Sequence, residues 1–148
     1  MDIIDVKKIG EDEINAFVNH LQDFEKDKAI RAGLYAGGAI LKRGGVMRLK
    51  LRMKSPYGRK GNLIKAFKVR VKKNKLGVLS GFGYPEGRHS WLLDQGTGIR
   101  HTKSYERRGI GPALRYWEDT RSQEGNRAMG AIRNGIERAV ERMNNGKR

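Results

Sequence analysis

The chain contains no cysteine among its 148 residues. It therefore forms no disulfide bond, has no thiolate nucleophile and cannot hold zinc through sulfur ligands. It also lacks any apolar run near the roughly 18 to 20 residues that span a bilayer. Its first residues are acidic, whereas a signal peptide begins with basic residues that lead into an apolar stretch. These absences predict a soluble protein with no membrane partner.

Acidic side chains are missing from residues 28–85, which carry 16 lysines and arginines and no aspartate or glutamate. Residues 1–27 carry 3 basic and 8 acidic side chains, and residues 86–148 carry 13 and 8. The formal net charge of +16 therefore comes from the central segment, because the charges of the two ends cancel. Such a segment has no internal partners for its like charges. It is either a solvated basic face or, as we expect, a contact for a polyanion or an acidic protein.

Motifs of known catalytic chemistry are also missing. The three histidines, His20, His89 and His101, lie far apart and form no HxxxH or HExxH pattern. Neither GxxxxGK[ST] nor GxSxG occurs. A metal-dependent hydrolytic site could still be assembled from Glu86, His89 and Asp94. The sequence otherwise predicts a protein that is not an enzyme and needs no cofactor or metal.

The length matches one domain with three charge regions. Residues 1–27 are expected to hold an acidic N-terminal helix, and residues 28–85 a basic long helix followed by a hairpin. Residues 86–148 are expected to supply a strand, a long loop and C-terminal helices. The boundaries between these three regions follow the distribution of acidic and basic residues along the sequence.

Apolar spacing predicts a first helix over residues 11–26 and a longer one over 28–53. The long helix carries five glycines, each of which costs about 1 kcal/mol against alanine. Either packing compensates for them or the helix breaks at Gly44 and Gly45. Small residues at three- and four-residue steps form one face where another backbone could approach closely: Ala29, Gly33, Ala36 and Gly37.

Between residues 67 and 72, apolar residues alternate with cations, which predicts a strand with one buried and one solvated face. The apolar face comprises Phe67, Val69 and Val71, and the cationic face comprises Lys68, Arg70 and Lys72. A turn at 73–75 leads into a second strand at 76–82, so this region is expected to form a hairpin.

The rest of the chain predicts further strand and helix segments. We expect a third strand over 89–95 with Trp91 in the core, then a polar loop over 96–111 that is too long for a simple connector. A helix from Pro112 to about Gly125 precedes a last helix. The apolar stripe of that last helix is Met129, Ile132, Ile136, Ala139, Val140 and Met143. The element order predicts an α+β fold: N-terminal helices including a long one, a small antiparallel sheet with a hairpin, and C-terminal helices.

The cations of the long helix and hairpin are candidates for contact with DNA or for lining a DNA channel. They are Arg48, Lys50, Arg52, Lys54, Arg59, Lys60, Lys68, Arg70 and Lys72. The long loop supplies candidates for contact between subunits: Gly96, Thr97, Gly98, Arg100, Arg107 and Arg108. Tyr57 and Tyr84 lie beside prolines among the cations, where they are either plain turn residues or platforms for base stacking.

Four short motifs resemble, in order, the tail-completion or neck protein family of long-tailed bacteriophages. The motifs are Gly61-Asn62-Leu63, the strand Phe67 to Lys73, the segment Ser90 to Thr97 with Asp94 before Gly96-Thr97, and Gly109 to Ala113. With the long helix, the resemblance covers roughly residues 28–143. The threonine that commonly precedes the Gly-x-Leu segment in the family is missing here, and Pro56 matches the family proline only loosely.

The resemblance implies a structural virion protein at the head–tail junction, assembled in the cytoplasm of a bacterial host. It implies a homo-oligomeric ring, six-fold or twelve-fold, around the channel that double-stranded DNA traverses. Portal, neck or tail proteins would be its other partners. A ring subunit needs complementary surfaces for its neighbours, and a basic inner surface suits a DNA channel. The alternative is a small nucleic-acid-binding module that acts outside a virion.

Overall fold

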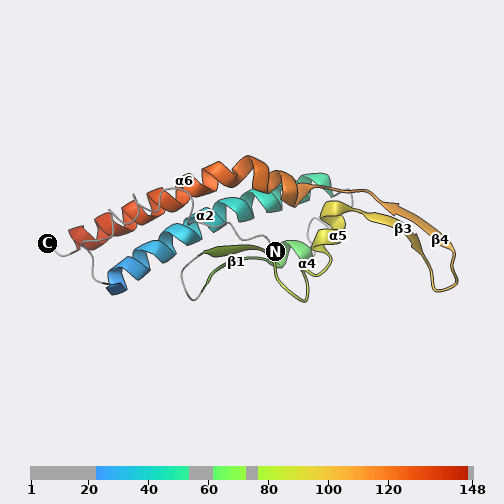
Figure 1. Cartoon of the computed structure of the whole chain (residues 1–148), viewed down its shortest axis with the longest axis horizontal. Coiled ribbons are helices and arrows are strands. Elements are labelled where there is room, and N and C mark those ends of the chain that lie inside the picture. Colours follow the sequence, from blue (N-terminus) through green and yellow to red (C-terminus); the bar gives the residue numbers. More distant parts are fainter. Residues whose placement is uncertain (1–22, 54–61, 73–76, 147–148) are drawn as a thin grey trace.

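A computed structural model describes residues 23–53, 62–72 and 77–146. Figure 1 shows an elongated molecule with two long helices, a short hairpin beside them and a second hairpin that projects from one end. The elements are α2 (Asp23–Arg52), α4 (Asn62–Lys65), β1 (Phe67–Val71), β2 (Val78–Phe82), α5 (Ser90–Gln95), β3 (Thr97–His101), β4 (Arg107–Gly111) and α6 (Tyr116–Asn145). The predicted α+β class is confirmed.

The two 30-residue helices, α2 and α6, pack against each other in antiparallel directions (Figure 1). The small-residue face of α2 makes this close contact possible, as the sequence predicted. A β-carbon on Gly33 would collide with Ile136, and one on Gly37 would collide with Ile132 and lie 2.9 Å from the Ala128 carbonyl oxygen. Any larger side chain at these two positions would force the helices apart.

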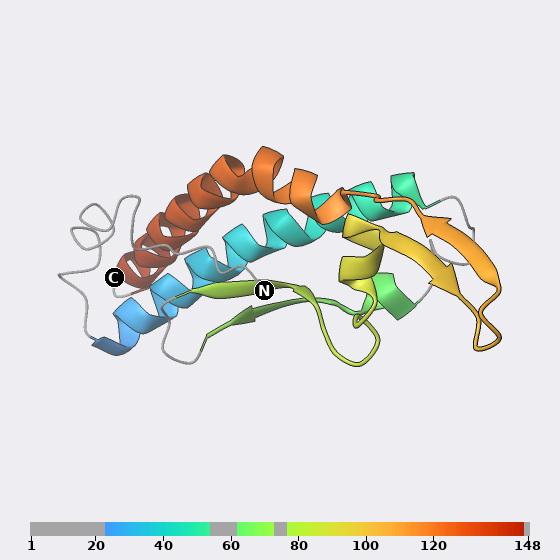
Figure 2. The same ribbon diagram turned by 45° about the vertical axis from the view of Figure 1, so that its right-hand side comes forward.

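An adjoining face of α2 packs on the hairpin of β1 and β2, which pair antiparallel from Phe67↔Phe82 to Val71↔Val78. A β-carbon on Gly38 would meet Val69 and Val78, so the absence of a side chain at this position lets the hairpin pack closely on the helix. Helix α2 therefore lies between α6 and the β1–β2 hairpin (Figure 2). The predicted alternation is confirmed, since Phe67 is buried while Lys68 and Arg70 are exposed.

Of the two alternatives left open for Gly44 and Gly45, the structure shows compensation by packing, because α2 continues through both glycines. Both glycines are buried: a β-carbon on Gly44 would lie 3.0 Å from Glu124, and one on Gly45 would lie 2.8 Å from the Phe67 ring. Packing on α6 and β1 therefore offsets their low helix propensity. The predicted helix over 11–26 lies outside the described residues except for 23–26, which belong to α2.

The C-terminal half holds one long helix where the sequence predicted two. Helix α6 runs unbroken through Gly125 and ends at Asn145, and Pro112 lies before its start. The predicted apolar stripe is confirmed, since Ile132, Ile136 and Val140 are buried against α2. This continuous burial holds the helix together across Gly125.

Two other predictions are wrong. The expected strand over 89–95 is the short helix α5, and the expected loop over 96–111 is the antiparallel hairpin of β3 and β4. A short apolar run does not distinguish helix from strand, and tertiary contacts decide it here. The Tyr116 hydroxyl donates to the Ser90 carbonyl oxygen at 2.9 Å, and the Leu114 amide donates to the Leu93 carbonyl oxygen at 2.9 Å.

In the part of the chain that the structure describes, no helix combines the length and apolar character needed to cross a membrane.

Candidate nucleic-acid interface

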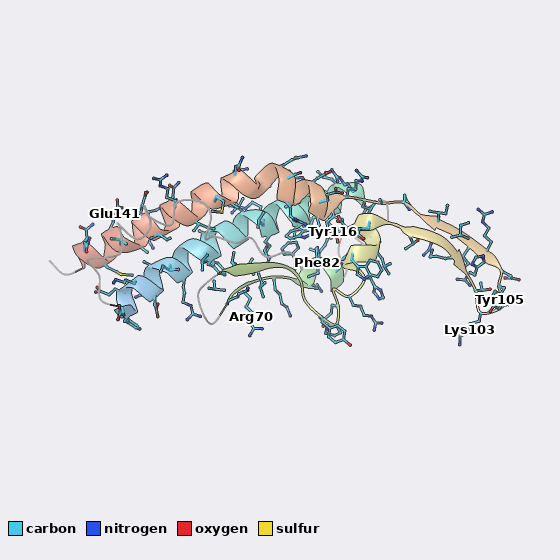
Figure 3. All side chains as sticks on the ribbon, in the orientation of Figure 1. Arg70, Phe82, Lys103, Tyr105, Tyr116 and Glu141 are labelled. Carbon is cyan, nitrogen blue, oxygen red and sulfur yellow. The ribbon has the colours of Figure 1, made fainter. Side chains whose placement is uncertain are left out.

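The outer face of the β1–β2 hairpin carries three cations, Lys68, Arg70 and Lys72, which we call the hairpin face. The register places Lys68 opposite Gly81 and Arg70 opposite Leu79, so no acid lies across the strand from either one. Lys68 and Arg70 are exposed and Lys72 is half-buried. Arg70 points away from both long helices (Figure 3).

The three cations of the hairpin face repel one another. Alternate residues of a strand lie about 6.6 Å apart, which is within the Debye length of about 8 Å at physiological salt. Within the described residues, none of the three forms an ion pair or a side-chain hydrogen bond. The repulsion is relieved when an anion is close, so the hairpin face is chemically suited to a phosphate backbone or an acidic protein surface.

Arg48 does not belong to such an interface, and its prediction as a DNA-facing residue is corrected. Its side chain is buried between α2 and α6, where it forms an ion pair with Glu124 at 3.1 Å. It also donates a hydrogen bond to Gln123 Oε1 at 2.8 Å. The Arg48 charge is therefore neutralised inside the molecule and joins the two long helices.

The Arg52 side chain also has its partners within the molecule. Its guanidinium lies 2.5 Å from the Asp119 carboxylate and donates to the Leu114 carbonyl oxygen at 2.8 Å. Lys50 is exposed on α2 and not on the hairpin. The other candidates, Lys54, Arg59 and Lys60, lie outside the described residues. Of the nine residues predicted to contact DNA, the structure thus brings together the three of the hairpin face.

The candidate metal ligands Glu86, His89 and Asp94 form no metal site. Among the described residues, no group of three histidine, aspartate or glutamate side chains is placed to hold an ion. Asp94 is buried, and its Oδ1 accepts a hydrogen bond of 2.6 Å from the Trp117 amide in the first turn of α6. The Asp94 carboxylate is therefore a helix cap, which satisfies an amide that has no partner within the helix.

The aromatic residues singled out from the sequence differ in burial. Phe67 is in the core, where its ring packs edge-on against Phe82 and Trp117. Trp91, expected in the core, is 59% exposed, because α5 turns its indole outward. Tyr84 is 80% exposed in the turn before α5, and Tyr57 lies outside the described residues.

A concavity of about 490 Å³ lies where β2, α5 and the start of α6 meet. Trp91, Asp94, Tyr116 and Glu118 contribute to its lining. Burial raises the pKa of the Tyr116 phenol above its ordinary value, and the nearby Asp94 carboxylate adds to this effect. Tyr116 is therefore a neutral structural group that anchors α5 to α6.

The hairpin formed by residues 97–111, which we call the arm, contains most of the predicted subunit-contact residues. Arg100, Arg107 and Arg108 are exposed on it, as is Gly98. Gly96 and Thr97 lie at its base: Gly96 has a φ of 81°, and the Thr97 hydroxyl accepts a hydrogen bond from the Gly111 amide. The role of these residues in subunit contact stays a prediction. They lie on a hairpin, whereas the sequence analysis expected a loop.

The sequence analysis missed one feature of the arm, the pair formed by Ile99 and Ile110. These residues lie opposite each other on β3 and β4 and are 50% and 61% exposed. The alternation of Thr97, Ile99 and His101 with Gly98 and Arg100 could have predicted the first strand. The glycines at both ends of the segment favoured the loop interpretation.

Comparisons with models of protein families, with curated proteins and with solved structures found no match to this chain.

Proposed function

We propose that the chain is a non-enzymatic structural protein of a tailed bacteriophage, a head–tail connector, neck or tail-completion subunit that forms a ring around the DNA channel. The observation that carries the proposal is the hairpin face: Lys68 and Arg70 exposed on β1 and the half-buried Lys72 directly after it, unpaired among the described residues. The motif order of the sequence also supports it. Localisation would be the virion, after assembly in the host cytoplasm.

Weak, sliding contact with DNA fits a face of this kind. Lysine and arginine on a regular strand attract phosphates without reading bases, because only contacts to base edges carry sequence information. Three neutralised phosphates correspond to a slope of about −2.7 in the plot of log affinity against log salt concentration. A channel wall needs such modest attraction, since the genome must pass along it.

The decisive measurement is the mass of the purified protein, alone and mixed with the cognate portal or tail-tube protein. We expect a homo-oligomeric ring, or incorporation into a complex with one of these partners. A strict monomer that joins neither would overturn the proposal.

A triple variant, Lys68→Glu with Arg70→Glu and Lys72→Glu, tests the hairpin face. The matched control is Lys28→Glu with Lys42→Glu and Arg43→Glu, which makes the same change of charge at exposed positions of α2. For a connector, the hairpin variant should lose assembly or DNA retention in particles, and the control should keep both. Equal behaviour of the two variants would show that total charge matters and the hairpin face does not.

The acid-free segment also supports a second candidate, a nucleic-acid-binding module that acts outside a virion. It predicts tight binding to short DNA duplexes and a steep loss of affinity between low and physiological salt. In that case the hairpin variant loses duplex binding in solution, and no phage component joins the protein. Titration of a labelled duplex at several salt concentrations separates the two functions.

A further inference from the structure

Strand β2 has one edge that no described strand covers, because its sheet consists of β1 and β2 alone. Proteins commonly protect such an edge with charged residues, proline or a β-bulge. The five residues of β2 include no charge and no proline, and their register with β1 is regular throughout. The arm differs, since its register shifts twice and both of its strands carry arginine. The edge of β2 therefore lacks the usual protection against pairing with a further strand.

A hydrogen bond at the end of the hairpin shows which backbone groups point to this edge. The Gly83 amide donates to the Ala66 carbonyl oxygen at 2.8 Å, so these two residues are a bonded pair. Bonded and non-bonded pairs alternate along an antiparallel ladder, which makes Ser80 and Phe82 members of non-bonded pairs. Their amides and carbonyls point away from β1. Among the described residues, neither backbone has a hydrogen-bond partner.

The same edge opens onto the concavity of about 490 Å³ between β2, α5 and the start of α6. Ser80, Gly81 and Phe82 line it consecutively, which places the backbone of β2 in its wall. The Phe82 and Tyr116 rings also line it, with centroids 5.6 Å apart (Figure 3), and so does Trp91, which is 59% exposed. Pockets of about 300–1,000 Å³ hold small ligands, so this concavity can take a bulky apolar side chain.

An open strand edge beside a concavity has the chemistry of a site for an extended peptide. A strand added to such an edge gains main-chain hydrogen bonds, and pockets along the edge receive its alternate side chains. A nucleic acid has no row of alternating amides and carbonyls to match the edge. The site uses the backbone of β2, whereas the hairpin face consists of side chains on and directly after β1.

The charge of the sheet indicates an acidic partner. Lys68 and Arg70 lie on the outer face of β1, opposite Gly81 and Leu79 of β2. Neighbouring strands lie about 4.8 Å apart, so an added strand would lie about 10 Å from β1. The long side chain of Lys68 can extend toward that strand, because Gly81 puts no side chain in its way. Acidic residues on the outer face of the added strand would therefore be attracted.

The inner face of the added strand should be apolar. The Asp94 carboxylate in the concavity accepts a hydrogen bond from the Trp117 amide, and Glu118 lies 3.8 Å from Arg115. These acids have partners in the molecule, so they do not call for a charged side chain from outside. An aromatic side chain that enters the concavity could pack edge-on against the rings of its wall.

We propose that the open edge of β2 binds an extended acidic segment of another protein by strand addition. The main chain of the segment forms hydrogen bonds with Ser80 and Phe82, and its acidic side chains face Lys68 and Arg70. One bulky apolar side chain lies in the concavity beside Trp91. The inference goes beyond the proposed function and depends neither on a ring nor on DNA.

A synthetic peptide tests the site on the full chain. The probe is a short fluorescein-labelled peptide in which glutamate alternates with valine around a central phenylalanine. One comparison peptide has lysine in place of glutamate, and another keeps the sequence but carries N-methyl groups on its backbone amides. We expect saturable binding of the acidic peptide and at least about tenfold weaker binding of the other two. Absence of binding by the acidic peptide, or equal binding of either comparison peptide, would overturn the inference.

Ser80→Pro removes an amide that points to the open edge, a place where a strand tolerates proline. The matched control is Ser80→Ala, because both variants lose the hydroxyl that donates to the Gly38 carbonyl oxygen at 3.2 Å. The proline variant should bind the acidic peptide at least about tenfold more weakly than the alanine variant. Trp91→Ala, at an exposed position, should also weaken binding and does not depend on the strand tolerating proline. Unchanged binding in either variant that folds would overturn the inference.

These variants leave the charge of the protein unchanged, so they separate the inference from the proposed function. A protein that binds the peptide but stays a monomer and joins no phage component would overturn the proposed function alone. Two results without peptide binding would reassign the edge and overturn the inference. Loss of self-association in Ser80→Pro would assign it to a second copy, and loss of duplex binding would assign it to nucleic acid.

Discussion

Arg48 and Glu124 form an ion pair at 3.1 Å between the two long helices, and both side chains are nearly buried. Glu124 is also 3.4 Å from Arg127, which is 71% exposed on the outside of α6. One carboxylate thus contacts a buried and an exposed guanidinium. The two contacts differ in their expected contribution to stability, because solvent screens only the outer one.

Replacing Glu124 by alanine should therefore destabilise the fold strongly. Arg48 would keep its buried charge without a carboxylate, which costs about 3–5 kcal/mol in the free energy of unfolding. The control Arg127→Ala removes only the exposed contact and should cost less than about 1 kcal/mol. Urea denaturation of both variants measures the difference. Equal losses would mean that Arg48 does not depend on this partner.

Gly37→Ala should separate the long helices. The added β-carbon would collide with Ile132 and approach the Ala128 carbonyl oxygen, and overpacking of this kind costs about 1–3 kcal/mol. Gly130→Ala is the matched control on α6, because a β-carbon there meets nothing within 4 Å. It should raise stability by up to about 1 kcal/mol through helix propensity. Thermal unfolding of both variants measures the difference. A shift of the melting temperature in the same direction for both would contradict the close contact of Gly37 with α6.

Asp94→Ala should weaken the start of α6. The Trp117 amide loses its acceptor, and loss of a helix cap costs about 0.5–2 kcal/mol. Asp94→Asn retains an acceptor oxygen and should recover most of the stability. Chemical denaturation of the two variants gives the comparison, and an alanine variant as stable as the asparagine variant would contradict the capping role.

Alkaline pH should destabilise the fold through Tyr116. The pKa of this phenol is raised in the folded protein, first by burial and then by Asp94, above the ordinary value of 10.0. Above about pH 10 the unfolded chain therefore loses this proton more readily, and stability falls as pH rises; below that pH the contribution is constant. Unfolding free energies between about pH 9 and pH 11 should fall more steeply for the unmodified protein than for Tyr116→Phe. Parallel pH dependences of the unfolding free energy for the two proteins would mean that Tyr116 does not cause the loss of stability.

Local patterns predicted the elements whose burial follows a simple period. The stripe around Ile136 and the alternation from Phe67 to Lys72 both correspond to faces that the structure buries or exposes. The close approach of helices at Gly33 was also predictable, because small residues at helical spacing have few other uses. These features depend on neighbours along the chain.

Features that depend on distant partners were not predictable. Arg48 was counted among the cations of an open face, because its partner Glu124 lies 76 residues away. The segment from Ser90 to Gln95 is helical because of contacts with the start of α6, which no local pattern records. The arm was hidden by its glycines, since Gly109 with its φ of 80° belongs to an irregular strand that resembles a loop in sequence.

The backbone at Gly96 sets the direction in which the arm leaves the body of the molecule. Its strands of five residues extend about 17 Å at 3.3 Å per residue, so a change of about 10° at Gly96 would move the far end by about 3 Å. The positions of the exposed side chains near the tip, such as Tyr105, are therefore set by the backbone angles of one glycine at the base and by the Asp94 cap beside it.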